Sequence, residues 1–311
     1  MGSVSARRIH VICDVLLSRL PCPDANSDHD RRGPAPAGYG LWGRFRAYRL
    51  VIVNARATLF DLYGDHLRVR GGRASVAALV RLLAPLGIAP AAVRTAVSRM
   101  VRQGWLRPVR LPHGPGYELT PKAVRRLDEA AARIYRTAAA PWDGRWNVLV
   151  VPPIRERPRR ERVRASLTYL GYAPLTETTW IGPHASTEVD AVLAAESVEA
   201  TRFDAVLDGD PAALVARAWD LDALGRSYET WLKDAEQLVG SLPPGAAPDD
   251  AFAVRSRLVH GWRKFLFTDP GLPKELLPAD WPGERATAYF EREAARLLPP
   301  SAAFVDHCLT A

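Results

Sequence analysis

Cysteine is scarce in this sequence. The three cysteines, Cys13, Cys22 and Cys308, are an odd number, and no two of them form a pair matched by a second pair at metal-ligand spacing. Such a set does not suggest structural disulfides. Because disulfides persist mainly in oxidising compartments, the simplest interpretation is a reduced protein of the cytoplasm.

Long apolar runs are also missing. No stretch approaches the roughly 18–20 apolar residues that a membrane helix needs. The N-terminal stretch ARRIHVICDVLLSRLPC has two arginines before a partly apolar run, but His10, Asp14 and Arg19 interrupt it. This pattern does not favour a signal peptide. We therefore expect a cytoplasmic protein that has no membrane partner.

The patterns that mark most enzyme sites are absent as well. There is no glycine-rich phosphate loop, no Ser/His/Asp order of a hydrolase and no metal-ligand cluster. Asp143 precedes a strand-like stretch, NVLVV, but no second carboxylate motif accompanies it. Metal-dependent cleavage of a phosphodiester usually needs more than one acidic ligand. We expect no catalytic residue, no metal and no cofactor, with a metal-dependent nuclease as the alternative.

Acidic residues are few in one segment only. Residues 54–140 contain 15 basic and 5 acidic residues, a net charge of +10, within a chain whose overall net charge is +8. Residues 141–311 contain 19 basic and 25 acidic residues, a net charge of −6. The positive charge is therefore local, and it permits nucleic acid, an anionic membrane or an acidic ligand as a partner.

A chain of 311 residues is too long for one ordinary core, so we predict several domains. The mixture of helical and strand patterns predicts the α+β class. Residues 21–40 are rich in proline, glycine and aspartate, which indicates disorder. We predict four segments: a disordered extension (1–53), a winged helix-turn-helix (54–140), a ferredoxin-like α+β domain (141–219) and a helical C-terminal domain (220–311).

The order of elements within 54–140 is what suggests the winged helix-turn-helix. Helical patterns cover 55–67, 75–87, 88–104 and 121–138, with two short strands around a turn at 105–120. Ser75 and Pro90 stand where helices begin, and Gly87 and Gly104 stand where they end.

The third predicted helix has two different faces. At about 100° per residue, Val93, Val97 and Met100 fall on one arc. The opposite arc has no acidic residue and carries Arg94, Thr95, Ser98, Arg99 and Arg102. Arginine and hydroxyl side chains suit phosphates and base edges. A solvated surface helix is the alternative, but such a face has no i,i+4 ion pairs to stabilise it.

The wing would add further cations to this candidate DNA surface. Arg107 and Arg110 lie in the ribbon, and Arg68, Arg70 and Arg73 lie before the second helix. For each of these arginines, ordinary surface charge is as good an explanation as contact with a DNA phosphate. Trp105 and Leu106, where the third helix runs into the first strand, are the expected anchors. A protein-interaction role for the winged helix remains a third hypothesis.

Several longer stretches resemble the PaaX family of bacterial transcriptional repressors. They are LLAPLGIAPAAVRTAVSRMVRQGWL, YELTPKAVRRLDEAAARIY, WDGRW, TWIGPH and LVHGWRKFLFTDPGLPKELLPADWPG. The resemblance implies an N-terminal winged helix, a ferredoxin-like middle domain similar to CRISPR-associated small nucleases, and a helical C-terminal domain. It also implies a homodimer that binds palindromic double-stranded operator DNA in the cytoplasm, associated with the nucleoid when bound. An aryl-acyl-CoA such as phenylacetyl-CoA would release it.

The resemblance leaves two matters open. Residues 1–53 have no counterpart in it, so either the start codon lies further downstream or the segment is a genuine disordered arm. The effector would need cations beside an apolar pocket. The candidates from two separate stretches are Arg159, Arg160, Arg164, His260, Trp262 and Arg263. Solvated ion pairs and a packing motif are the structural alternatives for these two groups.

Overall fold

The computed structural model of this chain describes residues 54–112, 114–134, 142–186 and 188–311. The predictions for residues 1–53, an upstream start or a disordered arm, lie outside these residues. The described chain divides into two compact units. We call them the helical unit (54–134, 220–269 and 278–311) and the sheet unit (142–219 and 270–277). Residues from two predicted segments, the winged helix-turn-helix (54–140) and the helical C-terminal domain (220–311), thus contribute to one unit, and the predicted boundaries stay a prediction.

The helical unit begins with a helix that changes its winding. α2 (Ala55–Leu62) is capped by Asn54, whose side chain accepts a hydrogen bond from the backbone N–H of Arg56. The chain then continues as a π-helical turn (Tyr63–Leu67) and a 3-10 turn (Arg68–Arg70). This confirms the helix predicted over 55–67 and adds a π-helical turn, a feature often found at functional sites.

Local signals set the next two helices, α3 (Val76–Leu83) and α4 (Pro90–Arg102). The Ser75 hydroxyl accepts a hydrogen bond from the Ala78 N–H at 3.1 Å and caps α3. Gly87 and Gly104 have φ values of 77° and 71°, the left-handed region that favours glycine after a helix. The roles predicted for Ser75 and Pro90 at the beginnings of these helices are confirmed. α3 itself ends at Leu83, and a 3-10 turn (Ala84–Leu86) continues to Gly87.

A three-stranded antiparallel sheet follows, with the order β1-β3-β2. Its strands are β1 (Arg73–Ser75), β2 (Leu106–Leu111) and β3 (Gly114–Leu119), and α5 (Pro121–Ile134) comes next. The sequence predicts β2 and β3 but not β1, which is too short for an alternating pattern to show. At Gly116 a Cβ atom would lie 2.9 Å from the Ala74 carbonyl oxygen, so glycine is required where β1 meets β3.

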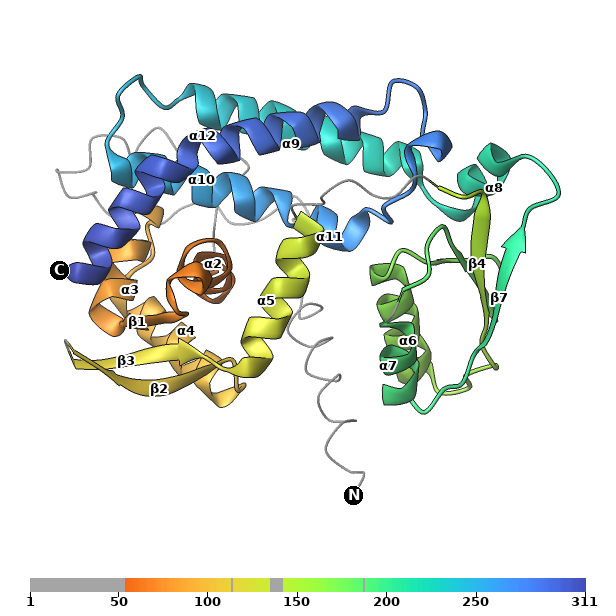
Figure 1. The fold of residues 1–311 in the computed structure, drawn as a ribbon, viewed down its shortest axis with the longest axis horizontal. Coiled ribbons are helices and arrows are strands. Elements are labelled where there is room, and N and C mark those ends of the chain that lie inside the picture. The colour runs from red at the N-terminus through yellow and green to blue at the C-terminus, as the bar shows by residue number, and fades with distance from the viewer. Residues whose placement is uncertain (1–53, 113, 135–141, 187) are drawn as a thin grey trace, which may run out of the picture. The chain divides into compact units, whose positions relative to one another are not determined.

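The C-terminal helices pack against these elements within the helical unit. They are α9 (Leu221–Gly240), α10 (Pro248–Trp262), α11 (Phe265–Thr268) and α12 (Pro282–Thr310). α10 lies between α12 and α2 and contacts both (Figure 1). Trp262 stacks on Phe290 with ring centroids 4.6 Å apart, and Trp231 meets Trp262 edge-on at 4.7 Å. These rings form the core of this helical layer.

The last turns of α12 reach back to the start of the described chain. The Arg81 guanidinium donates a hydrogen bond to the Cys308 carbonyl oxygen at 2.7 Å. Nε of Arg70 lies 2.6 Å from Oδ1 of Asp306. The helical unit is therefore closed by contacts between segments more than two hundred residues apart.

The sheet unit alternates strands and helices. Its elements are β4 (Arg145–Val150), α6 (Arg157–Tyr169), β5 (Ala173–Pro174), β6 (Thr179–Gly182), α7 (Val189–Ala195), β7 (Thr201–Val206), α8 (Pro211–Ala218) and a 3-10 turn (Lys274–Leu276). The sheet has the order β5-β6-β4-β7, with every neighbouring pair antiparallel. This arrangement fits the ferredoxin-like fold expected for the segment. The two-residue strand β5 is not predicted from the sequence.

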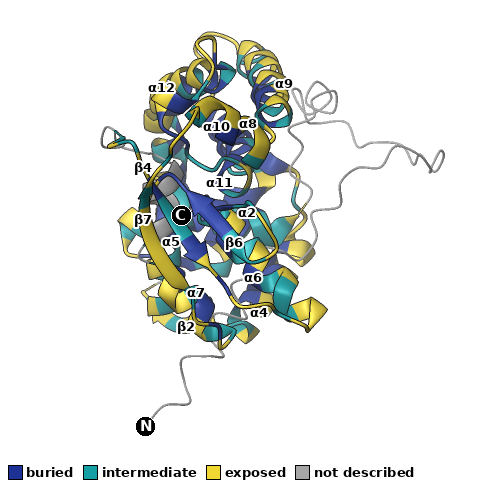
Figure 2. Cartoon of the chain, turned by 90° about the vertical axis from the view of Figure 1, so that its right-hand side faces the viewer, coloured by how far each residue is buried: buried dark blue, intermediate teal, exposed yellow. Residues whose placement is uncertain are grey.

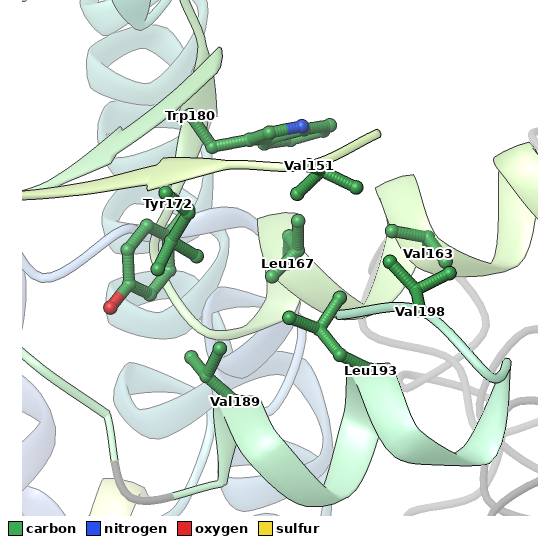
Figure 3. Close-up of a cluster of buried hydrophobic side chains, with 9 residues drawn as sticks. Val151, Val163, Leu167, Tyr172, Trp180, Val189, Leu193 and Val198 are labelled. Carbon is green, nitrogen blue, oxygen red and sulfur yellow. The ribbon is translucent and has the colours of Figure 1, made fainter. Parts of the chain in front are cut away.

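Apolar side chains fill the space between this sheet and its helices. Figure 3 shows the cluster, in which Trp180 lies over Leu167 of α6 and Val163 of the same helix lies beside Val198. The Tyr172 hydroxyl donates a hydrogen bond to Oδ1 of Asn147 at 2.7 Å. The core therefore lies on one side of the sheet, with α6 and α7 covering that side.

Candidate nucleic-acid interface

α4 presents the polar face that its sequence predicts. Arg94, Thr95, Ser98, Arg99 and Arg102 are all exposed, while Val93, Ala96, Val97 and Met100 are buried. The buried face packs on α2 and α3. The basic residues of α4 therefore share one solvent-facing surface on a helix that is fixed from behind.

Not every polar group on this face is free to bind a partner. The Thr95 hydroxyl donates a hydrogen bond to the carbonyl oxygen of Ala91 at 2.9 Å, so its proton is already used. Thr95 keeps a methyl group and acceptor capacity for a ligand. Arg94 and Arg99, by contrast, are both exposed, and an arginine guanidinium carries five N–H donors.

The end of α4 is anchored where it enters β2. Trp105 and Leu106 are each 2% exposed, as expected for anchors. Nζ of Lys122 lies 4.2 Å from the centre of the Trp105 ring, and Phe60 meets that ring edge-on at 5.2 Å. The cation and the aromatic edge complete the surroundings of the tryptophan. The orientation of β2 relative to α4 is thereby set.

The two arginines predicted in the ribbon do not act as a pair. Arg107 and Arg110 are both exposed, but they are three residues apart on β2 and so point to opposite faces of the ribbon. Arg107 also forms an ion pair with Glu118, with NH2 and Oε1 2.7 Å apart. Only one of the two lies on any given side of the ribbon.

The arginines before α3 are partly engaged within the chain. Arg68 bonds to Asp128, and Arg70 pairs with Asp306. Arg73 is exposed on β1. The cations that this surface offers most openly are therefore those of α4.

Two buried carboxylates connect α2 and its π-helical turn to α10 and to the residue after it. The sequence analysis did not predict them. Asp61 of α2 contacts Arg263, and its Oδ2 lies 2.7 Å from Nδ1 of His260. Asp65, one turn later, pairs with Arg255 through two contacts of 2.6 and 3.0 Å. We call this set of five side chains the buried ion-pair cluster. It holds the elements behind α4 against the C-terminal helices.

The electrostatics of the cluster follow from its burial. Burial alone would raise the pKa of Asp61, but the charge of Arg263 and the hydrogen bond from His260 outweigh it and lower the pKa below its ordinary value. Asp61 is therefore an anion at neutral pH. A buried anion with cationic partners is expensive to leave unpaired, so each partner holds the other in place.

His66 lies beside the cluster in a different state. It is 1% exposed and packs against Phe252, with ring centroids 5.4 Å apart. Burial lowers the pKa of His66 to about 4, although the nearby carboxylate of Asp65 opposes this change. His66 is therefore neutral in the folded protein at physiological pH.

A small cavity opens among these side chains. It is lined by Thr58, Asp61, Leu62, Asp65, His66, Leu86, Phe252, Ser256 and Val259. Its accessible space of about 10 Å³ suits a single water molecule. A pocket for a drug-sized ligand has roughly 300–1,000 Å³. The cavity is therefore too small to hold an acyl-CoA.

The six residues predicted to contact an effector are not brought together within one unit. Arg159, Arg160 and Arg164 belong to the sheet unit, whereas His260, Trp262 and Arg263 belong to the helical unit. His260 and Arg263 pair with Asp61, and Trp262 is a packed core residue. The packing interpretation of this C-terminal motif accounts for all three contacts.

Two of the three candidate arginines of α6 form hydrogen bonds within the sheet unit. Arg159 donates hydrogen bonds to the carbonyl oxygens of Glu196 and Ser197 at 2.6 and 2.7 Å, next to the end of α7. Arg160 donates to the carbonyl oxygen of Ile154 at 3.1 Å. Arg164 is exposed on the same helix. Of the three, Arg164 is the residue most open to an external ligand.

Comparison with known proteins identifies the family. Three family models match consecutive segments: PaaX-like protein over residues 54–123, the PaaX protein central Cas2-like domain over 139–213, and the PaaX-like protein C-terminal domain over 219–307. Transcriptional repressor PaaX of Escherichia coli (strain K12) is 32% identical over 271 residues, 84% of this chain and 85% of that protein. The chain belongs to the PaaX family.

A solved structure supports the same relationship. Uncharacterized protein Rv0674 from Mycobacterium tuberculosis is 27% identical, with a TM-score of 0.55 over 83% of this chain and 99% of that one. The resemblance that the sequence motifs indicate is confirmed. The Cas2-like segment of the PaaX family corresponds to the sheet unit of this chain.

Three further observations concern the described part of this PaaX-family chain. Among its residues, no three His, Cys, Asp or Glu side chains gather closely enough to hold a metal ion. No helix there has the length and apolar character needed to cross a bilayer. Asp143, the lone nuclease candidate, is exposed, and its side chain accepts a hydrogen bond from the Arg145 N–H at 3.0 Å. This contact is that of a turn residue before β4.

The buried ion-pair cluster predicts a stability difference between two aspartates. Asp61→Ala is expected to lower the free energy of unfolding by about 2–4 kcal/mol, because Arg263 and His260 lose a buried counterion. Asp306→Ala breaks a pair whose carboxylate is 59% exposed, and should cost less than about 1 kcal/mol. Urea denaturation followed by circular dichroism measures both. Equal losses for the two variants would contradict the assignment.

His66 predicts a specific pH dependence. The pKa of His66 is about 4 in the folded protein and about 6.5 in the unfolded chain. The unfolded chain therefore binds the proton first, so stability is lost as pH falls from about 6.5 towards 4 and is independent of His66 above this window. The loss amounts to roughly 3 kcal/mol at most. His66→Phe should flatten the unfolding free energy between pH 6.5 and 5, and unchanged slopes would overturn the prediction.

Proposed function

We propose that this chain is a DNA-binding transcriptional repressor that reads its operator with α4. The observation that carries the proposal is the exposed, acid-free face of α4 on a buried seat. α3 and α4 would form the helix-turn-helix, and β2 and β3 would form the wing. The name of the Escherichia coli relative, a transcriptional repressor, supports the same function.

The exposed side chains of α4 suggest which residues would contact bases and which would contact phosphates. Recognition helices contact base edges mainly through residues in their N-terminal part. Arg94 and Arg99 would bind guanine edges or phosphates, and the free methyl group of Thr95 suits thymine. Ser98 would donate or accept at the same groove. Arg102, with Arg107 or Arg110 of the wing, would contact phosphates and set the register.

The proposal extends to assembly and regulation. A homodimer would place two α4 helices one helical turn of DNA apart, roughly 34–36 Å, on a palindromic operator in the bacterial cytoplasm. An aryl-acyl-CoA would favour a state in which this spacing no longer matches, and would release the DNA. Phenylacetate-type catabolism is the process that we propose it regulates, as the resemblance to the PaaX family implies. Arg164 is the candidate contact for the phosphates of the effector.

Operator binding should depend on the α4 arginines. Arg94→Ala and Arg99→Ala should each leave folding intact and weaken binding by about 1–3 kcal/mol, because each removes a charged groove contact. Arg285→Ala, an exposed arginine of α12, is the matched control and should bind like the parent protein. Fluorescence anisotropy with the adjacent promoter measures all three, at several salt concentrations. Unchanged affinity in both α4 variants would remove α4 from the interface.

The effector class is tested separately. A gel-shift panel with phenylacetyl-CoA, other aryl-acyl-CoA thioesters and free CoA should show release of the promoter by an aryl thioester but not by free CoA. Arg164→Ala should raise the thioester concentration needed for release without changing operator affinity. Release by none of the thioesters would show that the effector class is wrong, while leaving DNA binding itself in place.

A further inference from the structure

β7 is an exposed strand at the edge of the sheet unit. It stands last in the order β5-β6-β4-β7, so one of its two hydrogen-bonding edges faces no other strand of the described chain. Thr201, Arg202, Phe203, Asp204 and Val206 are all exposed, and β7 appears mostly yellow in Figure 2. Proteins usually protect such an edge, because it pairs readily with another chain.

Two exposed apolar side chains of β7 do not offer that protection. Phe203 is 52% exposed and Val206 is 67% exposed, among the largest apolar exposures in the described residues. Val150, on the neighbouring strand β4, is 39% exposed. Apolar side chains on an open edge are typical of strands that join a partner.

The order of charges along β7 specifies which partner strand fits. In an antiparallel pair, side chains directly opposite each other lie on the same face of the sheet. If β7 pairs with β7 of a second copy about a twofold axis normal to the sheet, one residue must lie on that axis. The candidates for this central position are Arg202, Phe203 and Asp204.

Only one of these centres places opposite charges together. With Arg202 on the axis, two arginines face each other, and with Asp204 on the axis, two aspartates do. With Phe203 on the axis, Arg202 of each copy lies opposite Asp204 of the other. Opposite charges across strands are stabilising and like charges are destabilising, so the sequence of β7 is self-complementary in one register.

We propose that two copies of this chain join through β7, antiparallel, with Phe203 on the twofold axis. The two four-stranded sheets would then form one continuous eight-stranded sheet. The two Phe203 rings would cover each other on the face opposite α6 and α7. The inference rests on the dimer of the proposed function and names the surface that forms it.

The contacts of Arg202 and Asp204 within one copy are compatible with this pairing. Arg202 bonds to Asp190, whose side chain is 82% exposed. Asp204 pairs with Arg145, with Nε and Oδ2 2.6 Å apart, and its side chain is 61% exposed. A carboxylate accepts several hydrogen bonds at once. Asp204 therefore has room for Arg145 of its own chain and Arg202 of the second copy.

Cysteine cross-linking tests the axis directly. In the full chain carrying Cys13→Ser, Cys22→Ser and Cys308→Ala, Phe203→Cys is added. Opposite residues in an antiparallel pair have Cα atoms roughly 4.5–5.5 Å apart, within the range of a disulfide. Mild oxidation should therefore give a covalent dimer on a non-reducing gel.

Two further cysteine variants define the register. Ala205→Cys alone should not cross-link, because the two copies of this position would be about 13 Å apart along the strand. Thr201→Cys alone should not cross-link for the same reason. A mixture of the Thr201→Cys and Ala205→Cys chains should give a heterodimer. If the cross-links arose only from chance collisions, Thr201→Cys alone and Ala205→Cys alone would also form covalent dimers. Cross-linking of either single variant would therefore overturn the register.

Charge exchange gives a second, independent measurement. Asp204→Arg places two arginines against two arginines across the interface, and Arg202→Asp places aspartates against aspartates. Each variant alone should raise the dimer dissociation constant at least roughly tenfold in analytical ultracentrifugation. A mixture of the two variants restores both opposite-charge pairs and should form dimers again. Asp208→Arg, an exposed position after β7, is the control and should dimerise like the parent.

The outcomes separate this inference from the proposed function. A dimer that survives both charge variants, or that fails to cross-link through Phe203→Cys, uses another surface and overturns the inference, whether or not it binds DNA. A parent chain that is monomeric at micromolar concentration also overturns it. If the parent dimer cross-links as expected but does not bind promoter DNA, the β7 interface is supported and the repressor function is rejected.

Discussion

The fold of the helical unit depends on two carboxylates that have left water. Asp61 and Asp65 lie one turn apart at the end of α2 and in its π-helical turn, and their partners Arg255, His260 and Arg263 come from α10 and the residue after it. Burial does not make these ion pairs strong, because both charges lose their hydration. Removing one partner is nevertheless costly, because it leaves the other charge buried and unpaired. α4 rests on α2, so the position of the exposed arginines depends on pairs formed on the other side of that helix.

Much of the region around α4 is predictable because its signals are local. Ser75, Pro90 and Gly104 act within a few residues of the helix ends that they set, and the two faces of α4 follow from helical periodicity alone. The strand order of the sheet unit is less direct, because β5 has only two residues and no pattern of its own. Its place follows from the tertiary pairing with β6.

The buried ion-pair cluster is the part that no local signal reveals. Asp61 and Arg263 are separated by 202 residues, and nothing in the composition near either residue distinguishes a buried charge from a solvated one. The same is true of Arg159, which reads as surface charge but binds the carbonyl oxygens at the end of α7. Residues of the HGWRKF stretch look like a ligand site in one dimension because charged and aromatic residues alternate. In three dimensions they divide into ion pairs and core.

The contact of Arg81 with the carbonyl oxygen of Cys308 has a consequence for how the protein is made. Residues 54–134 leave the ribosome long before α10 and α12, yet Asp61 and Asp65 pair with side chains of α10 and with Arg263 after it, and Arg81 donates to a carbonyl oxygen of α12. Burying these charges before their partners exist would be costly, so they stay in water until α10 and α12 have been made. The packing behind α4 is therefore complete only after α10 and α12 have been synthesised.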